Sequence, residues 1–158
     1  MNDRFKFRAG FTISFYDIAG NDVERQIILD SCFSIDNGGE GICVNEEIIQ
    51  EALDIYVAKD EHKSAWDFIN ANYAETDGYY FIDSVDFLDQ CTGLKDKNDK
   101  LIYENDYVTH KGNIYKVFWN KTKISLENIL NNDIIDIQEF DCMEVIGNEH
   151  EKGNIRKI

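Results

Sequence analysis

The sequence predicts an α+β fold, with strands and a helical hairpin in the N-terminal part and a small coiled β-sheet or SH3-like barrel in the C-terminal part. Three observations predict it. Apolar residues alternate near the N-terminus, recur at helical spacing in the next third, and then form short alternating runs between glycine and asparagine turns. A chain of 158 residues is long enough to bury a hydrophobic core.

The N-terminal strands are predicted from their period of two. Phe11, Ile13 and Phe15 alternate with more polar neighbours, which is typical of a half-buried strand. The turn at residues 20–22 then separates them from a second predicted strand at residues 26–35. Residues 79–88 are rich in aromatic and branched side chains and predict a further strand after the helices.

The helical hairpin is predicted from capping and spacing. Asn45 suits an N-cap, and acidic residues follow it where the helix dipole favours negative charge. Apolar residues then recur at helical spacing as far as Val57, and again over residues 64–74. Residues 59–63 connect the two helices. The hairpin leaves these acidic residues facing outward: Glu47, Glu51, Asp54, Glu61 and Asp67.

The C-terminal part predicts six short strands separated by tight turns. They are expected at residues 101–103, 107–109, 114–119, 122–126, 134–137 and 143–146. Lys111-Gly112-Asn113 fits a hairpin turn, because glycine adopts the positive φ that such turns require. Strands this short, with no room for helices between them, favour a coiled sheet or barrel.

The domain prediction divides the chain at residue 89. Residues 1–89 form an acidic α+β lobe, and residues 90–158 form a β-rich lobe. One continuous domain is the alternative, because neither lobe reaches the usual domain size of about 100 to 150 residues.

Charge is concentrated in the middle of the chain. The net charge is −15, and residues 22–90 carry 17 acidic and 3 basic residues. Such a field repels phosphates and attracts basic partners, so nucleic acid is an unlikely partner and a basic protein, such as a DNA-handling one, is the expected partner. The candidate partner-binding residues are Glu47, Glu51, Asp54, Glu61 and Asp67. The alternative is that these side chains form an ordinary solvated face.

A second hypothesis places nucleic-acid binding in the C-terminal part. Its candidate residues are Lys111, Lys116, Trp119 and Lys121, with bases stacking on aromatic rings and lysines following the phosphates. The alternation argues against it, because Tyr115 and Val117 share one strand face with Trp119 and indicate core packing.

No pattern of residues indicates catalysis. The four cysteines are scattered, and His62, His110 and His150 lie far apart in polar sequence and are expected at the surface. The four carboxylates Asp96, Asp99, Glu104 and Asp106 suggest a cation site, but the spacing fails for an EF-hand and favours a solvated turn. We therefore predict no enzymatic activity, no cofactor and no metal.

The expected location is the cytoplasm. No apolar run approaches the roughly 18 residues that a membrane span needs, and the first residues show no signal-peptide core. We accordingly expect no association with membranes.

Several motifs together resemble those of the YopX family, small proteins encoded by bacteriophages and prophages. The resemblance rests on QCTGLKDKN at residues 90–98, IYEND at 102–106, Val108, VIGN at 145–148 and KFRAG at 6–10. The family typically has tyrosine at position 91, glycine at 99 and 105, and tryptophan at 10.

The resemblance implies an accessory phage protein of unestablished activity, without known catalytic residues or cofactor. Some members of the family form oligomers, which predicts a homo-oligomer here. A self-assembling structural protein is accordingly a further alternative to partner binding.

Overall fold

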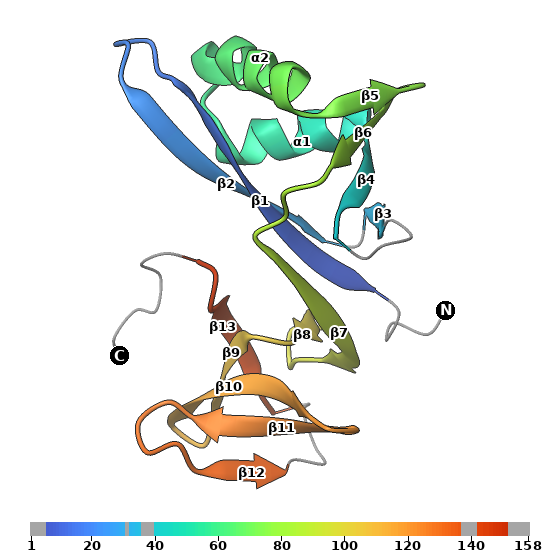
Figure 1. Ribbon diagram of the computed structural model, residues 1–158. Coiled ribbons are helices and arrows are strands. Elements are labelled where there is room, and N and C mark those ends of the chain that lie inside the picture. Colours follow the sequence, from blue (N-terminus) through green and yellow to red (C-terminus); the bar gives the residue numbers. More distant parts are fainter. Residues whose placement is uncertain (1–5, 31, 36–39, 137–141, 152–158) are drawn as a thin grey trace. The chain divides into compact units, whose positions relative to one another are not determined.

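The computed structural model describes residues 6–30, 32–35, 40–136 and 142–151. The chain divides into two compact units (Figure 1): residues 8–88, here called the N-terminal unit, and residues 89–158 with 1–7, called the C-terminal unit. Each unit contains its own cluster of buried apolar side chains. The α+β prediction is confirmed. Whether the chain folds as two independent domains or as one stays a prediction.

The N-terminal unit begins with a long antiparallel hairpin. Strand β1 (Phe7–Tyr16) pairs with β2 (Asp22–Asp30), and Phe11, Ile13 and Phe15 are buried as the alternation predicted. The prediction of one strand over residues 26–35 is wrong. Strand β2 ends at Asp30, and β3 (Phe33–Ile35) belongs to another sheet. The Asp30 carbonyl accepts a hydrogen bond from the Cys32 thiol at 3.1 Å, just after the end of β2.

The second sheet of this unit has the order β3-β4-β6-β5. Its members β4 (Ile42–Asn45), β5 (Ala74–Thr76) and β6 (Tyr79–Ile82) are short. The sequence did not predict β4 or β5. The predicted strand at 79–88 is interrupted after Ile82, and β7 (Phe87–Lys95) starts a new ladder that continues into the C-terminal unit.

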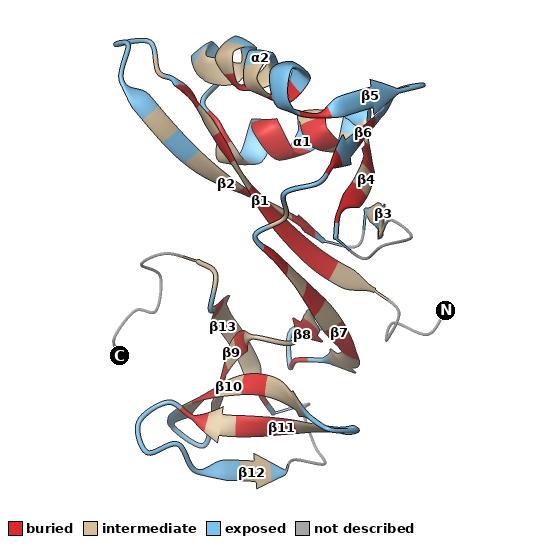
Figure 2. Ribbon diagram, viewed as in Figure 1, coloured by how far each residue is buried: buried red, intermediate tan, exposed pale blue. Residues whose placement is uncertain are grey.

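The helical hairpin is confirmed. Helix α1 (Glu46–Tyr56) and α2 (His62–Asn72) are joined through a 3₁₀ turn at Lys59–Glu61. The Asn45 side chain accepts a hydrogen bond from the Glu47 backbone at 2.8 Å, as an N-cap does. Both helices turn their apolar sides toward the core of the N-terminal unit (Figure 2), burying Ile49, Ala52, Leu53, Ala65 and Ile69.

The C-terminal unit is a curled antiparallel sheet preceded by the short strand β8 (Leu101–Tyr103). Its order is β12-β11-β10-β9-β13, built from β9 (Asp106–His110), β10 (Asn113–Asn120), β11 (Lys123–Asn128), β12 (Ile134–Asp136) and β13 (Glu144–Asn148). All six predicted strands are present; residue 137 lies outside the described residues. Within the described residues β12 and β13 do not pair, so the sheet is coiled and open rather than a closed barrel.

The core of the C-terminal unit lies on one face of this sheet. Tyr115 and Val117 of β10 point into it, together with Val108, Leu126 and Met143. This confirms the prediction that part of the aromatic set is core. No helix of the described chain is long and apolar enough to cross a membrane.

Candidate functional site

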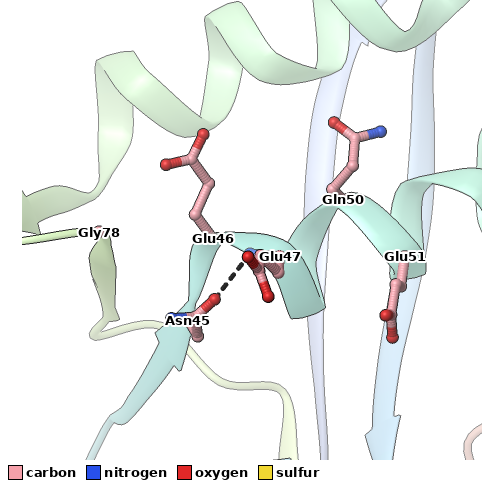
Figure 3. A pocket seen from close by; sticks show the side chains of 6 residues that line it. All are labelled: Asn45, Glu46, Glu47, Gln50, Glu51 and Gly78. Atoms are coloured by element: carbon pink, nitrogen blue, oxygen red, sulfur yellow. Dashed lines mark hydrogen bonds between the residues drawn. The ribbon is translucent and has the colours of Figure 1, made fainter.

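Three carboxylates line up along α1. Glu47, Glu51 and Asp54 are exposed, and their spacing of four and three residues places them on one side of the helix. We call them the acidic helix face. The start of this helix, with Asn45, Glu46, Gln50 and Gly78, also borders an open hollow (Figure 3).

The other two predicted partner-binding residues lie elsewhere. Glu61 ends the 3₁₀ turn and is half-buried, whereas Asp67 lies on α2 and pairs with Lys63 at 3.0 Å. Asp54 lies 3.6 Å from His62 Nδ1, so its charge is partly countered when that histidine is protonated. The structure therefore joins three of the five predicted residues in one row, and their role in binding stays a prediction.

An exposed isoleucine adjoins the acidic helix face. Ile55 is 75% exposed, follows Glu51 by four residues and is next to Asp54 in sequence. Sequence reasoning did not assign Ile55 to this surface. The available signal was its position outside the apolar stripe that contains Ile49, Ala52 and Leu53.

The alternative lysine site is dispersed. Lys111 and Lys121 occupy turns at opposite ends of β10. Lys116, between them, forms an ion pair with Glu149 at 2.8 Å. Trp119 is half-buried, and its buried Nε1 has no hydrogen-bond partner among the described residues, so its ring is not an open platform. The structure does not bring these four residues together as one basic patch.

In the segment with the family motifs, residues 90–108, buried carboxylates accept hydrogen bonds from backbone N–H groups. Asp96 is 5% exposed and accepts hydrogen bonds from the backbone N–H groups of Asn98 (2.8 Å), Lys100 (3.0 Å) and Val145 (2.9 Å). Burial alone would raise the pKa of Asp96, but these bonds, led by that of Val145, lower it below the usual value. Asp96 thereby ties the turn before β8 to the start of β13.

Asp106 acts similarly in the next turn. It is fully buried and accepts the Tyr103 N–H at 2.8 Å across the turn between β8 and β9. Of the four carboxylates predicted to form a solvated turn, Asp96 and Asp106 are therefore buried, because backbone donors replace water. In the part of the chain that the structure describes, no three His, Cys, Asp or Glu side chains group as a metal ion would require.

A further polar cluster surrounds Asp89, which is 2% exposed. Its carboxylate accepts the Asn105 amide at 2.8 Å and lies 3.0 Å from His150 Nε2. His150 is 18% exposed and His62 is 16% exposed, so both are half-buried and less exposed than the sequence led us to expect. The reason is that each imidazole ring lies beside a carboxylate, His62 beside Asp54 and His150 beside Asp89. The C-terminal unit thus uses its motif side chains to hold turns together.

These features define an acidic α+β protein whose motif residues build its C-terminal sheet and whose helix α1 presents a row of exposed carboxylates. Residues 43–155 match the model of the YopX protein family, and the chain belongs to that family. The match includes both helices and the whole curled sheet, whereas the resemblance at residues 6–10 lies outside it. No curated protein matches the sequence.

Proposed function

We propose that this protein is a non-enzymatic phage or prophage accessory protein that binds a basic host protein through the acidic helix face of α1. The observation that carries the proposal is the row of Glu47, Glu51 and Asp54, exposed on a rigid helix. A row of carboxylates on one helix side presents a regular negative charge to lysine and arginine side chains, which accelerates and orients association.

Ile55 supports a protein partner over a small cation. Protein interfaces combine an apolar contact with a polar rim, and a side chain 75% exposed beside carboxylates supplies that combination. Around it, residues 22–90 carry 17 acidic and 3 basic residues, so the field over this surface favours a basic partner. A DNA-handling protein is such a partner, because its own phosphate-binding surface is basic.

The test uses the tagged full-length chain and a nuclease-treated bacterial lysate at low and high salt. A retained protein is then purified and titrated against the wild type and the triple variant Glu47→Gln, Glu51→Gln, Asp54→Asn. We expect affinity to fall at least tenfold in the variant, and binding of the wild type to weaken with salt.

The matched control removes three other exposed charges of the same unit, Glu24→Gln, Asp60→Asn and Asp83→Asn. This control changes the net charge equally but leaves α1 intact, so we expect near wild-type binding. Equal losses in both variants would mean that only overall charge matters and would overturn the proposed surface.

Self-assembly is the second candidate function. Among the described strands β12 lies at the edge of its sheet, and nearby Leu130 and Ile134 are 86% and 55% exposed. Unpaired edge strands with apolar neighbours pair readily with another copy. Analytical ultracentrifugation of the wild type and of Leu130→Ser tests it: a monomer at all concentrations would exclude self-assembly.

A further inference from the structure

One cysteine of the C-terminal unit lies against a histidine. Cys142 Sγ is 3.3 Å from His110 Nδ1, although the residues are 32 positions apart in sequence. Strand pairing brings them together: His110 ends β9, Cys142 precedes β13, and the ladder aligns Thr109 with Glu144. Cys142 is an exposed residue.

We propose that Cys142 is a reactive thiol, with His110 as its proton acceptor, and that the pair is a modification site for small soft electrophiles. With the imidazole proton on Nε2, Nδ1 takes the thiol proton and leaves a thiolate beside an imidazolium. The thiolate then attacks carbon in an alkylating agent, forming an S–C bond and releasing halide. With a small disulfide it forms a mixed disulfide and releases the other half as a thiol.

The charged neighbours of the pair are consistent with this chemistry. Lys111 directly follows His110 and is exposed at the turn, where its positive charge favours an anionic sulfur. Glu144, two residues after Cys142, would oppose the thiolate, but it forms an ion pair with Lys97.

Cys32 offers an internal comparison. It is equally classed as exposed, but its thiol donates to the Asp30 backbone carbonyl, which cannot take up a proton. Cys43 is half-buried and Cys91 is buried. If exposure alone governed reactivity, Cys142 and Cys32 would react alike, whereas a proton acceptor accelerates Cys142 alone.

The experiment measures the alkylation rate of each cysteine by iodoacetamide in the full-length protein, by peptide mass spectrometry near neutral pH. An ordinary thiol is only a few per cent thiolate there, so we expect Cys142 to react about tenfold faster than Cys32. In His110→Gln, which keeps a hydrogen-bond acceptor without a basic nitrogen, Cys142 should slow to the rate of Cys32.

Two controls separate chemistry from damage to the fold. His62→Gln removes a histidine in the other unit and should change no cysteine rate. At strongly alkaline pH every exposed thiol is ionised, so wild type and His110→Gln should converge at Cys142, which a merely structural role of His110 would not produce. Equal rates at Cys142 and Cys32 in the wild type, or an unchanged Cys142 rate in His110→Gln, would overturn the proposal.

Discussion

The two units use the same residue types in opposite ways. In the N-terminal unit, Glu47 and Glu51 of α1 point into solvent and no other described residue forms an ion pair with them. In the C-terminal unit, Asp89, Asp96 and Asp106 are buried and accept hydrogen bonds from backbone or side-chain donors. Net charge therefore says little about a carboxylate's role, which depends on whether turns of the chain supply it with donors.

The contrast between exposed and buried carboxylates predicts which of them contribute to stability and which only to surface charge. The N-terminal unit is stabilised by its apolar core, and the exposed Glu47 and Glu51 of α1 are available for contacts with other molecules. The C-terminal unit has a smaller apolar cluster and adds buried carboxylates that fix its turns. Substitutions of acidic residues should accordingly affect folding in one unit and binding in the other.

The largest effect is expected for Asp96→Ala. The change leaves three backbone N–H groups without their charged acceptor, which should lower the free energy of unfolding of the C-terminal unit by about 3 kcal/mol. The chain has two tryptophans, Trp66 in one unit and Trp119 in the other. Urea unfolding followed by Trp119 fluorescence in a Trp66→Phe background measures this unit.

The matching change in the N-terminal unit is Glu51→Ala. Its carboxylate is exposed and alanine favours helices, so the free energy of unfolding should change by no more than about 0.5 kcal/mol. Trp66 fluorescence in a Trp119→Phe background reports it. A loss as large as that of Asp96→Ala would break the contrast between the units.

The pH dependence of the stability of the C-terminal unit tests the role of its buried carboxylates further. Because the pKa of folded Asp96 is lowered, its contribution to stability is present above the unfolded value of about 3.9 and is lost as pH falls through the folded pKa. Urea midpoints by Trp119 fluorescence should therefore fall on acidification. The fall should be shallower in Asp96→Asn; an identical slope in both proteins would contradict the role given to this carboxylate.

In the N-terminal unit, the free energy of unfolding should depend more on side-chain packing than on exposed charge. A methyl group at Gly10 would collide with the Phe87 ring, so Gly10→Ala should cost about 1 to 3 kcal/mol by Trp66 fluorescence. The family's tryptophan at position 10 has no room while Phe87 lies there.

A double-mutant cycle checks the cause. Adding Phe87→Leu should relieve the collision, so the double variant should lose less than the sum of the single losses. Additive losses would show that Phe87 is not responsible for the cost at Gly10. Gly20→Ala serves as the comparison, because apart from its chain neighbours no atom of the described residues lies within 4 Å of the added methyl, and only its φ of +83° opposes the change.

Local patterns in the sequence predicted much of the fold. Period two predicted the curled sheet, and the Asn45 cap predicted α1, because these signals come from neighbouring residues. Contacts between residues far apart in the sequence could not be predicted in this way. Nothing near Asp96 in sequence indicates that the Val145 N–H donates to it, and nothing near Cys142 indicates that His110 lies beside it. The acidic row on α1 was predicted, whereas Glu61 and Asp67 were grouped with it because sequence alone does not place one helix against another.

Small effects are also expected where this chain departs from the family's glycines. Asp99 and Asn105 both have φ near +64°, a backbone conformation that glycine adopts without strain. Asp99→Gly removes only an exposed ion pair with Lys95, so relief of strain should leave stability unchanged or raise it by up to about 0.5 kcal/mol.

Asn105→Gly gains the same relief but loses the hydrogen bond to buried Asp89, so a net loss of about 1 kcal/mol is expected. Trp119 fluorescence measures both variants under one condition. Opposite signs would show that Asn105 was retained for its bond to Asp89 and that Asp99 is only tolerated in its turn. A gain in stability for Asn105→Gly as well would mean that backbone strain outweighs the buried hydrogen bond, and that the carboxylates of this unit matter less to its stability than their burial indicates.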